Sequence, residues 1–310
     1  MARGDLDVAI VGGGMAGNLL ARQLSRTLPD LRVAVFDRKT HYSNNVGESM
    51  VEIASNYFVR RLGLSSYLYD RQYPKNGLRF FFDSAERNVP LEQMSEIGSA
   101  SLPFFPAFQI DRSRLETDLI EMNRMQGIQV HLGARVEEIA LGEGGGLHRL
   151  VVSEDGGSQT LEARWVVDAS GRSRLLARQL DLHVPETTLA NASAWGWFEG
   201  VADIDALGPE AFRARVRHAP RRLSTLHFLY PGYWIWFIPL RAGLTSVGVV
   251  CEGAVWAPAM LGREGLLAFL RRHAAVATLL HDAKPVDVAG MGHLSYGTRR
   301  FFGNDRWALV

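Results

Sequence analysis

Short apolar runs and one helical pattern alternate at the start of the chain, with glycines between them. Buried strands are predicted over 7–11, where β-branched and small apolar residues dominate, and over 31–36, which Asp37 closes. A glycine turn over 12–17 leads from the first run into a helix over 18–28, whose apolar residues recur at helical spacing. This order of strand, turn, helix and strand predicts the start of an α/β fold with a parallel sheet.

The middle of the chain predicts a second helix and then a meander. Helical spacing returns over 111–125, and a strand follows over 128–132. The segments 135–141, 147–154 and 160–167 alternate apolar and polar residues around glycine-rich turns, a pattern typical of antiparallel strands. We therefore expect a small antiparallel meander that ends in a second glycine turn.

The remaining segments indicate a second domain. The stretch 75–108 is rich in aromatic residues and irregular, which favours an insertion. Several strand-like segments rich in Trp, Tyr and Phe lie within 190–250, and apolar spacing predicts a helix over 263–280. The chain ends on an apolar strand over 306–310. Because a buried parallel strand needs cover on both faces, we expect the fold to continue beyond it.

Composition and charge exclude several classes of protein. Lys and Arg (34) nearly balance Asp and Glu (33), so no global positive field favours nucleic acid or an anionic membrane surface. No run of 18 apolar residues predicts a membrane span, and residues 1–5 lack the features of a signal peptide. The single Cys251 excludes intramolecular disulfides. We expect a folded, cytoplasmic protein.

No metal site is predicted, and the histidines without metal-ligand spacing are interpreted as surface or structural groups: His218, His227, His273, His281 and His293.

The first glycine turn has the spacing of a dinucleotide-binding fingerprint. Gly12-x-Gly14-x-x-Gly17 stands between a strand and a helix, where glycines permit a tight turn and close approach of a pyrophosphate to the helix N-terminus. Met15 and Ala16 complete this loop, and Asp37 lies 20 residues past Gly17, where a carboxylate can bind an adenosine ribose. A glycine-rich turn without a nucleotide is the alternative.

Three downstream segments favour FAD over NAD. The segment that ends in Arg112 resembles the one by which flavin monooxygenases bring an arginine toward the flavin. Asp168-Ala-Ser-Gly171 resembles their second dinucleotide-contacting turn, and Gly47-Glu48-Ser49 supplies a further glycine turn. Glu48, Ser49, Arg112 and Asp168 are therefore predicted FAD-binding residues, although each segment alone could be a simple capping or turn motif.

Two further motifs resemble the flavin-dependent halogenase family. Trp234-x-Trp236-x-Ile238-Pro239 matches the WxWxIP signature of that family, and Lys75-Asn-Gly77 is similar to the stretch that carries its catalytic lysine. Trp234 and Trp236 share one face of a strand and could instead fill a core. A lysine in a loop is usually a solvated charge, so the role of Lys75 depends on the resemblance.

The resemblance implies a doubly wound, three-layer, Rossmann-like FAD-binding domain and a substrate domain built on an antiparallel sheet. The FAD-binding domain is predicted over 1–74, 106–185 and 286–310, and the substrate-binding domain over 75–105 and 186–285.

The chemistry that the resemblance implies is halogenation of an electron-rich aromatic of phenol, pyrrole or indole type, free or tethered to a carrier protein. FADH2 from a separate flavin reductase would form a hydroperoxide with O2, which a halide ion would convert into hypohalous acid. Lys75 would hold that electrophile beside the substrate, while Trp234 and Trp236 would separate the substrate from the flavin. The choice of chloride or bromide, and homodimerisation, stay open.

Two departures from the family leave alternatives open. Phenol-type members carry Trp-Gly shortly after the lysine segment, where this chain has Phe81-Phe82. The Gly-Asp turn, halide loop and helical region that follow the strand at 306–310 in the family are absent from the sequence, which suggests truncation. A single-component FAD aromatic monooxygenase and a catalytically silent flavin-binding fragment are the alternative functions.

Overall fold

The computed structural model describes residues 5–216 and 218–310, and the chain divides into two compact units. Unit 1 comprises Met1–Val46, Arg112–Pro185 and Tyr296–Val310, and unit 2 comprises Gly47–Asp111 and Glu186–Ser295. Residues 1–4, on which the expected lack of an export signal partly rests, lie outside the described residues.

The boundaries of the units differ from the predicted domain boundaries. Residues 47–74, 106–111 and 286–295, which we expected in the FAD-binding domain, group with unit 2. The cause is pairing between distant segments, because the Met50 amide donates a hydrogen bond to the Phe108 carbonyl (3.0 Å) and residues 284–291 pair with 193–199. The assignment of cofactor and substrate roles to the two parts stays a prediction.

Unit 1 contains a parallel sheet in the strand order β19-β10-β1-β2-β7, with β18 antiparallel at its edge. The pairing brings the carboxyl ends of β1 and β10 together, since Val11 lies opposite Asp168. The strands are β1 Leu6–Val11, β2 Val33–Asp37, β7 Gln129–Leu132, β10 Gly157–Asp168, β18 Phe302–Gly303 and β19 Trp307–Leu309.

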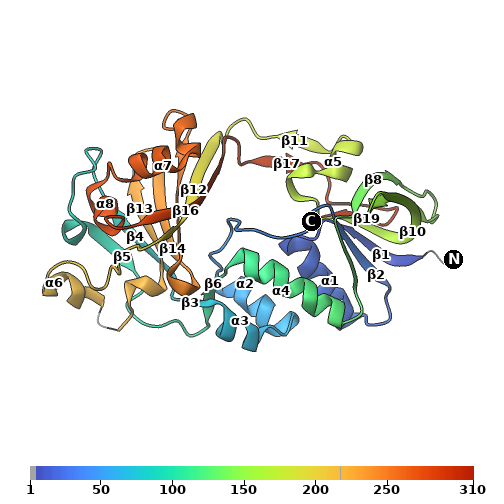
Figure 1. Ribbon diagram of the computed structural model, residues 1–310, viewed down its shortest axis with the longest axis horizontal. Helices are drawn as coiled ribbons and strands as arrows, with labels where there is room; N and C mark the ends of the chain where they lie inside the picture. Colours follow the sequence, from blue (N-terminus) through green and yellow to red (C-terminus); the bar gives the residue numbers. More distant parts are fainter. Residues whose placement is uncertain (1–4, 217) are drawn as a thin grey trace. The chain divides into compact units, whose positions relative to one another are not determined.

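Alternate residues of the buried strands in unit 1 form two separate cores. Val8 and Ile10 pack with residues of α1 (Met15–Thr27), and α4 (Arg112–Met125) lies beside α1 (Figure 1). Ala9 and Val11 face the opposite way, toward the antiparallel meander. The remaining elements of unit 1 are β8 Arg135–Ala140, β9 His148–Glu154, α5 Leu175–Gln179, β11 His183–Pro185 and β17 Tyr296–Thr298. The predicted three-layer α/β architecture and the meander are confirmed.

Unit 2 is built on a mixed seven-stranded sheet, mostly antiparallel, in the order β16-β12-β15-β14-β13-β4-β5. Its single parallel pair joins β13 to β4. The predicted insertion supplies two strands, β4 and β5, to this sheet. The strands are β4 Leu78–Phe82, β5 Ser95–Gly98, β12 Asn191–Glu199, β13 Thr225–Tyr230, β14 Tyr233–Pro239, β15 Thr245–Glu252 and β16 Lys284–Met291.

Helices α7 (Arg263–Leu270) and α8 (Ala274–Leu279) cover one face of this sheet (Figure 1). The single helix predicted over 263–280 was wrong, because the chain breaks at 271–273. There the buried His273 ring contacts the Leu270 carbonyl (2.9 Å) and the Tyr233 hydroxyl (2.8 Å). A side chain bonded across the core in this way redirects the backbone. The other elements of unit 2 are α2 Glu52–Asn56, a π-helical turn Tyr57–Arg61, α3 Ser65–Arg71, β3 Tyr73–Lys75, β6 Ala107–Gln109 and α6 Glu210–Arg213.

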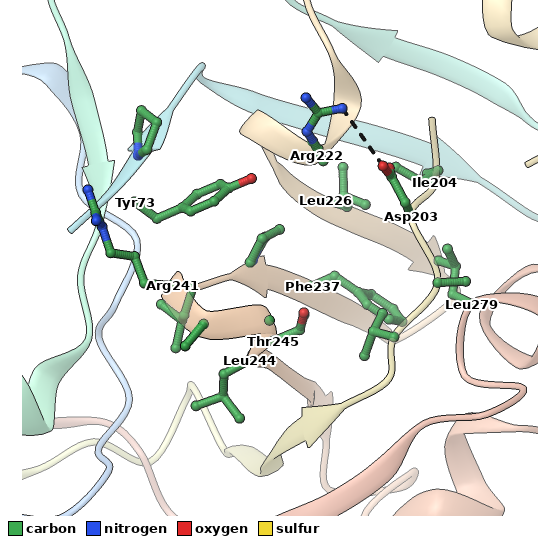
Figure 2. A pocket seen from close by; sticks show the side chains of 17 residues that line it. Tyr73, Asp203, Ile204, Arg222, Leu226, Phe237, Arg241, Leu244, Thr245 and Leu279 are labelled. Carbon is green, nitrogen blue, oxygen red and sulfur yellow. Dashed lines mark ion pairs between the residues drawn. The ribbon is translucent and has the colours of Figure 1, made fainter. Parts of the chain in front are cut away.

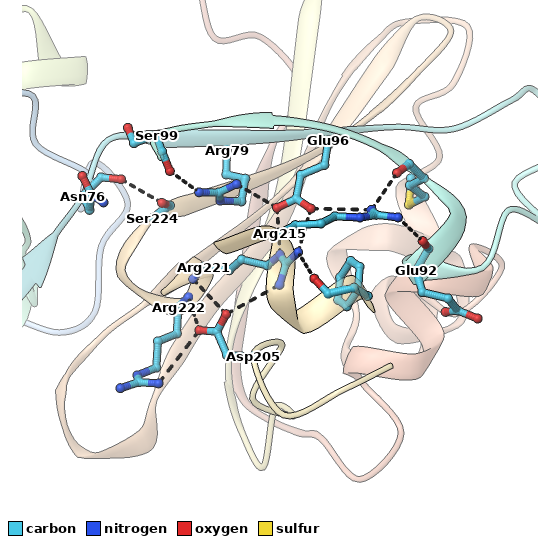
Figure 3. A network of polar contacts seen from close by, with 12 residues as sticks. Asn76, Arg79, Glu92, Glu96, Ser99, Asp205, Arg215, Arg221, Arg222 and Ser224 are labelled. Atoms are coloured by element: carbon cyan, nitrogen blue, oxygen red, sulfur yellow. Dashed lines mark hydrogen bonds and ion pairs between the residues drawn. The ribbon is translucent and has the colours of Figure 1, made fainter. Parts of the chain in front are cut away.

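A buried ionic cluster fastens the edge strand β5 to unit 2 (Figure 3). The Glu96 side chain is 5% exposed and accepts hydrogen bonds from Arg79 (2.7 Å) and Arg221 (2.7 and 2.8 Å). Arg221 is fully buried and its guanidinium lies 3.8 Å from the centre of the Phe212 ring. Burial alone would raise the pKa of Glu96, but the hydrogen bonds and charges of Arg221 and Arg79 outweigh burial and lower it.

We expect Glu96→Gln to destabilise the protein by about 3–5 kcal/mol, because it leaves buried guanidinium groups uncompensated. A carboxylate whose pKa is lowered by folding stabilises the fold above its unfolded pKa and loses that effect as pH falls through its folded pKa. The difference from the native chain should therefore be largest at neutral pH and smaller in acid. Urea unfolding at several pH values measures it. Glu121→Gln, which breaks the exposed pair with Arg124, is the control and should cost under about 1 kcal/mol.

Candidate functional site

The glycine turn of unit 1 combines crowded and open positions. Gly12 has a φ of +111°, and a Cβ there would lie 2.3 Å from the Ala169 carbonyl oxygen. A Cβ on Gly17 would lie 1.9 Å from the Gly12 carbonyl oxygen. At Gly14, by contrast, a Cβ would meet no atom within 4 Å. The outer glycines are thus required by the turn itself, whereas Gly14 borders open space.

The N-terminus of α1 faces this open position. Gly14 is the N-cap residue, and no side chain caps the helix. The first turn, which starts at Met15 and Ala16, contains no acidic residue that would neutralise the helix dipole. Exposed amide groups and the positive end of a helix favour a phosphate group. The loop therefore fits the pyrophosphate of a dinucleotide.

Two buried asparagines connect this loop to α4. The Asn18 side-chain amide donates hydrogen bonds to the carbonyl oxygens of Gly13 and Gly14, the second at 3.4 Å. Asn123 of α4 donates to the Asn18 carbonyl (3.0 Å) and side-chain oxygen (3.1 Å). Both asparagines are fully buried. This pair could not be predicted from the sequence, since a polar residue inside a helical pattern is its only local signal.

Asp37 lies at the end of β2 against the glycine turn, as the fingerprint predicted. Its carboxylate accepts hydrogen bonds from the Gly13 amide (2.8 Å), the Lys39 amide (2.9 Å) and the Tyr42 hydroxyl (2.8 Å). Burial and the neighbouring Asp37 raise the pKa of Tyr42, which keeps the phenol protonated as a donor. A carboxylate offers about four acceptor positions, so Asp37 retains capacity for a ribose hydroxyl.

The second predicted turn packs directly against the first. The Asp168 carboxylate accepts hydrogen bonds from the amides of Ser170 (2.9 Å) and Leu176 (2.7 Å), so both of its oxygens organise the turn into α5. The Ala169 amide donates to the Val11 carbonyl (2.8 Å) beside Gly12. In the described residues Asp168 shapes the loop rather than presenting a free carboxylate.

Arg112 forms the first residue of α4 and is held from two sides. Its guanidinium pairs with Glu116 one helical turn along and donates to the Val46 carbonyl (2.6 Å). Glu116 is buried, while the Arg112 side chain is 11% exposed. The predicted FAD-binding arginine is therefore fixed by the end of the 1–46 segment.

The sheet of unit 2 has one core face and one face rich in aromatic and polar groups. Leu226 and Phe237 point into the core beneath α7 and α8. Because side chains alternate along a strand, Trp234, Trp236 and Ile238 point to the other face. We call this the tryptophan face. Its other members, by register with those residues, are Phe80, Trp195, Trp197, Thr225, His227 and Ser246.

Close packing on the tryptophan face depends on one glycine. Trp236 lies opposite Gly248 of β15, where a Cβ would come within 2.4 Å of the Trp236 ring and 2.6 Å of the Trp195 Cβ. The Trp236 indole nitrogen donates to the Ser246 hydroxyl (3.3 Å). Trp236 and Ile238 are each 8% exposed, and Trp234 is half-buried. Pro239 ends the strand.

Lys75 is the last residue of β3 and is buried, whereas a lysine is normally solvated. Lys75 as a whole is 4% exposed, and its ammonium donates a hydrogen bond to the Met50 carbonyl oxygen (2.6 Å). Burial lowers the pKa of Lys75 to about 8, with Glu52 opposing the shift. The segment after Lys75 is joined to the start of β13, since the Asn76 amide donates to the Leu223 carbonyl (2.6 Å). A buried amine that titrates near neutral pH is suited to chemistry at that amine.

The predicted FAD-binding residues Glu48 and Ser49 contact the tryptophan face. The Trp197 indole nitrogen donates to the buried Glu48 carboxylate (2.6 Å). The Ser49 hydroxyl contacts the Thr225 hydroxyl (2.7 Å), to which the Gln109 amide also donates (2.9 Å). Sequence reasoning missed Gln109 and Thr225, because no spacing along the chain reveals that they meet across 116 residues.

A pocket of about 570 Å³ opens on the core side of the same sheet (Figure 2). Leu226, Phe237 and Leu279 supply apolar walls, while Tyr73 and the Arg222–Asp203 ion pair (3.8 Å) supply polar groups. Pro239 also lines it, so the signature strand borders both this pocket and the tryptophan face. Lys75 does not line this pocket.

Two classes of site are not found in the part of the chain that the structure describes. Over residues 5–216 and 218–310, no three His, Cys, Asp or Glu side chains are grouped to bind a metal ion. No helix in those ranges combines the length and apolar character needed to cross a membrane.

Comparison with known proteins adds family information to this geometry. The family described as FAD binding domain matches residues 5–226. Flavin-dependent halogenase chlA of Dictyostelium discoideum is 27% identical and covers 98% of this chain and 55% of its own length. The 1H-pyrrole-2-carbonyl peptidyl-carrier protein chlorinase of Pseudomonas fluorescens is also 27% identical, over 81% of this chain and 57% of its own length. The chain thus spans about half the length of these relatives.

Solved structures show the same fold. Halogenase PltM in complex with phloroglucinol and FAD superposes with a TM-score of 0.80 at 21% identity, over 98% of this chain and 63% of its own. CmlS, a flavin-dependent halogenase, superposes with a TM-score of 0.76 at 25% identity, over 100% of this chain and 53% of its own. The resemblance to flavin-dependent halogenases predicted from the signature is confirmed.

Proposed function

The chain belongs to the FAD-binding domain family, and we propose from this that it carries the flavin-binding and substrate-facing parts of a flavin-dependent halogenase. One observation carries the halogenase assignment within that family. Lys75 stands in the Lys75-Asn-Gly77 motif, which resembles the halogenase segment that carries the catalytic lysine. Its amine is buried in unit 2, the unit that presents the tryptophan face.

The glycine turn would hold the cofactor. The amides at the start of α1, with Gly14, Met15 and Ala16, would bind the FAD pyrophosphate, and Asp37 would bind the ribose. Reduced FAD, when bound, would activate O2, which supplies the oxidising equivalents that convert halide into an electrophilic halogen. Arg112 and Asp168 would then fix the loops of unit 1 around the cofactor.

Lys75 would bind the electrophile. Its ammonium donates hydrogen bonds that polarise hypohalous acid, and its neutral amine can accept the halogen directly. Trp234 and Trp236 would separate the substrate from the flavin, the role that the resemblance implies for them. The overall step converts one arene C–H bond into a carbon–halogen bond, with the ring proton and the hypohalous oxygen leaving as water.

The substrate and partners follow from the same proposal. Halogen electrophiles attack electron-rich rings, so we infer a phenol, pyrrole or indole type of substrate. The similarity to a pyrrole chlorinase that acts on a carrier protein favours testing a carrier-bound substrate as well as free arenes. A separate flavin reductase would supply FADH2, and chloride or bromide would be the co-substrate. Cytoplasmic location belongs to this proposal too, and homodimerisation stays open.

Turnover with reduced FAD, O2 and bromide tests the function. The purified protein, supplied with an independent flavin reductase, is expected to give a monobrominated phenol or pyrrole, identified by mass spectrometry. A hydroxylated product formed with NAD(P)H and no halide would instead support the aromatic monooxygenase alternative. Bound FAD without either product would support the catalytically silent alternative.

We expect Lys75 to titrate near pH 8. The chain contains three lysines, so reductive methylation with ¹³C-formaldehyde gives few signals, and the exposed Lys39 and Lys284 provide references. Below about pH 8 the buried amine is an ammonium, and above it the free amine dominates. An NMR titration measures this midpoint. A Lys75 signal that moves together with both exposed references would contradict the burial that the proposed chemistry needs.

A further inference from the structure

His227 is a polar side chain at the centre of the tryptophan face. It lies directly opposite Trp236 on one side and Phe80 on the other. Its ring stacks on Phe80, with centroids 5.2 Å apart and planes 25° apart. The neighbouring Leu226 and Phe228 of the same strand point into the core, so alternation fixes His227 on the opposite side. The sequence analysis interpreted this histidine as a surface or structural group.

The hydrogen-bonding of the ring is incomplete. The Nδ1 atom is buried and has no hydrogen-bond partner among the described residues. The side chain as a whole is only partly buried, so the Nε2 edge is the accessible one. The Nε2 atom can therefore accept a hydrogen bond from a ligand on this face, or donate one to it.

The ring is neutral over the working pH range of most proteins. Burial, and then the nearby Lys75 ammonium, lower the pKa of His227 to about 4, while backbone groups of Thr225 and Arg79 oppose the shift. A neutral imidazole always has one nitrogen that accepts a hydrogen bond. The strand that follows Lys75 pairs with β13, since Leu78 lies opposite Thr225 and Phe80 opposite His227, so Lys75 and His227 lie at neighbouring parts of unit 2. A positive donor and a neutral acceptor therefore lie near each other in unit 2.

From this placement we propose that His227 is the residue that orients the substrate, accepting a hydrogen bond from the O–H or N–H group of an electron-rich arene. The proposal rests on the function proposed above and names the group that is recognised in its phenol, pyrrole or indole substrates, the O–H or N–H donor. An acceptor on a phenol O–H raises electron density at the ortho and para carbons, which are the positions that an electrophilic halogen attacks. Trp236 and Phe80 would flank the ring of such a substrate.

A matched pair of probes tests the inference by binding alone. Resorcinol donates hydrogen bonds, whereas 1,3-dimethoxybenzene has the same ring and cannot donate. Quenching of tryptophan fluorescence reports their binding to the tryptophan face without turnover. We expect the native protein to prefer resorcinol, His227→Phe to bind resorcinol about tenfold more weakly or worse, and both proteins to bind 1,3-dimethoxybenzene equally. His227→Gln retains an acceptor and should restore part of the preference.

Failure of this inference can be distinguished from failure of the proposed function. Equal binding of the two probes by the native protein, or unchanged resorcinol binding in His227→Phe, would overturn the inference even if halogenation is observed. If resorcinol binding depends on His227 but no halogenated product forms with reduced FAD and bromide, the proposed function fails while the binding role of His227 stands. With active enzyme, kcat/KM for resorcinol should fall in His227→Phe by the same factor as binding.

Discussion

Lys75→Met is expected to abolish halogenation while FAD binding is retained. The change removes the amine but keeps most of the apolar stem, so the local packing survives. We expect the rate of product formation to fall by about 10²–10⁴-fold, the usual range for loss of a side chain that donates or accepts a proton in the reaction. Mass spectrometry of a bromide reaction measures the product, and flavin absorbance of the purified variant measures the cofactor. Lys75→Ala should behave in the same way.

Lys75→Arg is the matched control for charge. Its guanidinium remains protonated at all relevant pH values, so it can donate hydrogen bonds but cannot act as a neutral amine. Activity retained in Lys75→Arg would show that Lys75 acts as a cation that polarises hypohalous acid. Activity lost in both variants would show that Lys75 acts through its neutral amine. Unchanged turnover in Lys75→Met, with flavin bound as in the native chain, would contradict the catalytic role.

The stability of Lys75→Met provides an independent check on folding. Folding lowers the pKa of this lysine, so the unfolded chain binds more protons than the native one between about pH 8 and 10.5. The penalty for burying the ammonium is therefore full below about pH 8 and disappears as pH rises toward 10.5. The stability of the variant relative to the native chain should fall over this interval, as urea titrations at successive pH values would show.

Local sequence signals predicted the glycine turn because each of its requirements is local. Gly12 needs a positive φ, Gly17 needs contact with the preceding turn, and Asp37 follows the next strand. Strand alternation also placed Trp234 and Trp236 on one face. These features follow from spacing along the chain, which a sequence displays directly.

The rest of the site could not be predicted because it depends on pairing between distant segments. Glu48 and Ser49 were assigned to the cofactor domain from their glycine turn, yet they contact Trp197 and Thr225 of unit 2. The neighbours of His227 could not be predicted from the sequence, because the register between β13, β14 and β4 places it between Trp236 and Phe80. The break in the predicted helix over 263–280 likewise depends on a partner, the Tyr233 hydroxyl, from another strand.

Gly14→Val is expected to abolish FAD binding without unfolding the protein. A Cβ at this position meets no atom within 4 Å, and Gly14 has a φ of −69°, which any residue adopts. The added side chain therefore occupies the open space at the start of α1, where the pyrophosphate would lie. We expect FAD affinity to fall at least about a hundredfold, equivalent to about 2.7 kcal/mol. Fluorescence titration of FAD measures the affinity, and urea unfolding without FAD measures the stability.

Gly17→Ala is the control that distinguishes loss of the pyrophosphate site from loss of the fold. Its Cβ would lie 1.9 Å from the Gly12 carbonyl oxygen, so α1 must shift away from the turn. We expect this variant to lose both FAD affinity and stability, whereas Gly14→Val should lose affinity and cost no more than about 1 kcal/mol of stability, because valine is a poorer N-cap residue than glycine. If Gly14→Val retains flavin, the pyrophosphate does not bind at the start of α1, and the assignment of the glycine turn is wrong. If both variants unfold equally, Gly14 is a requirement of the turn and not of the ligand.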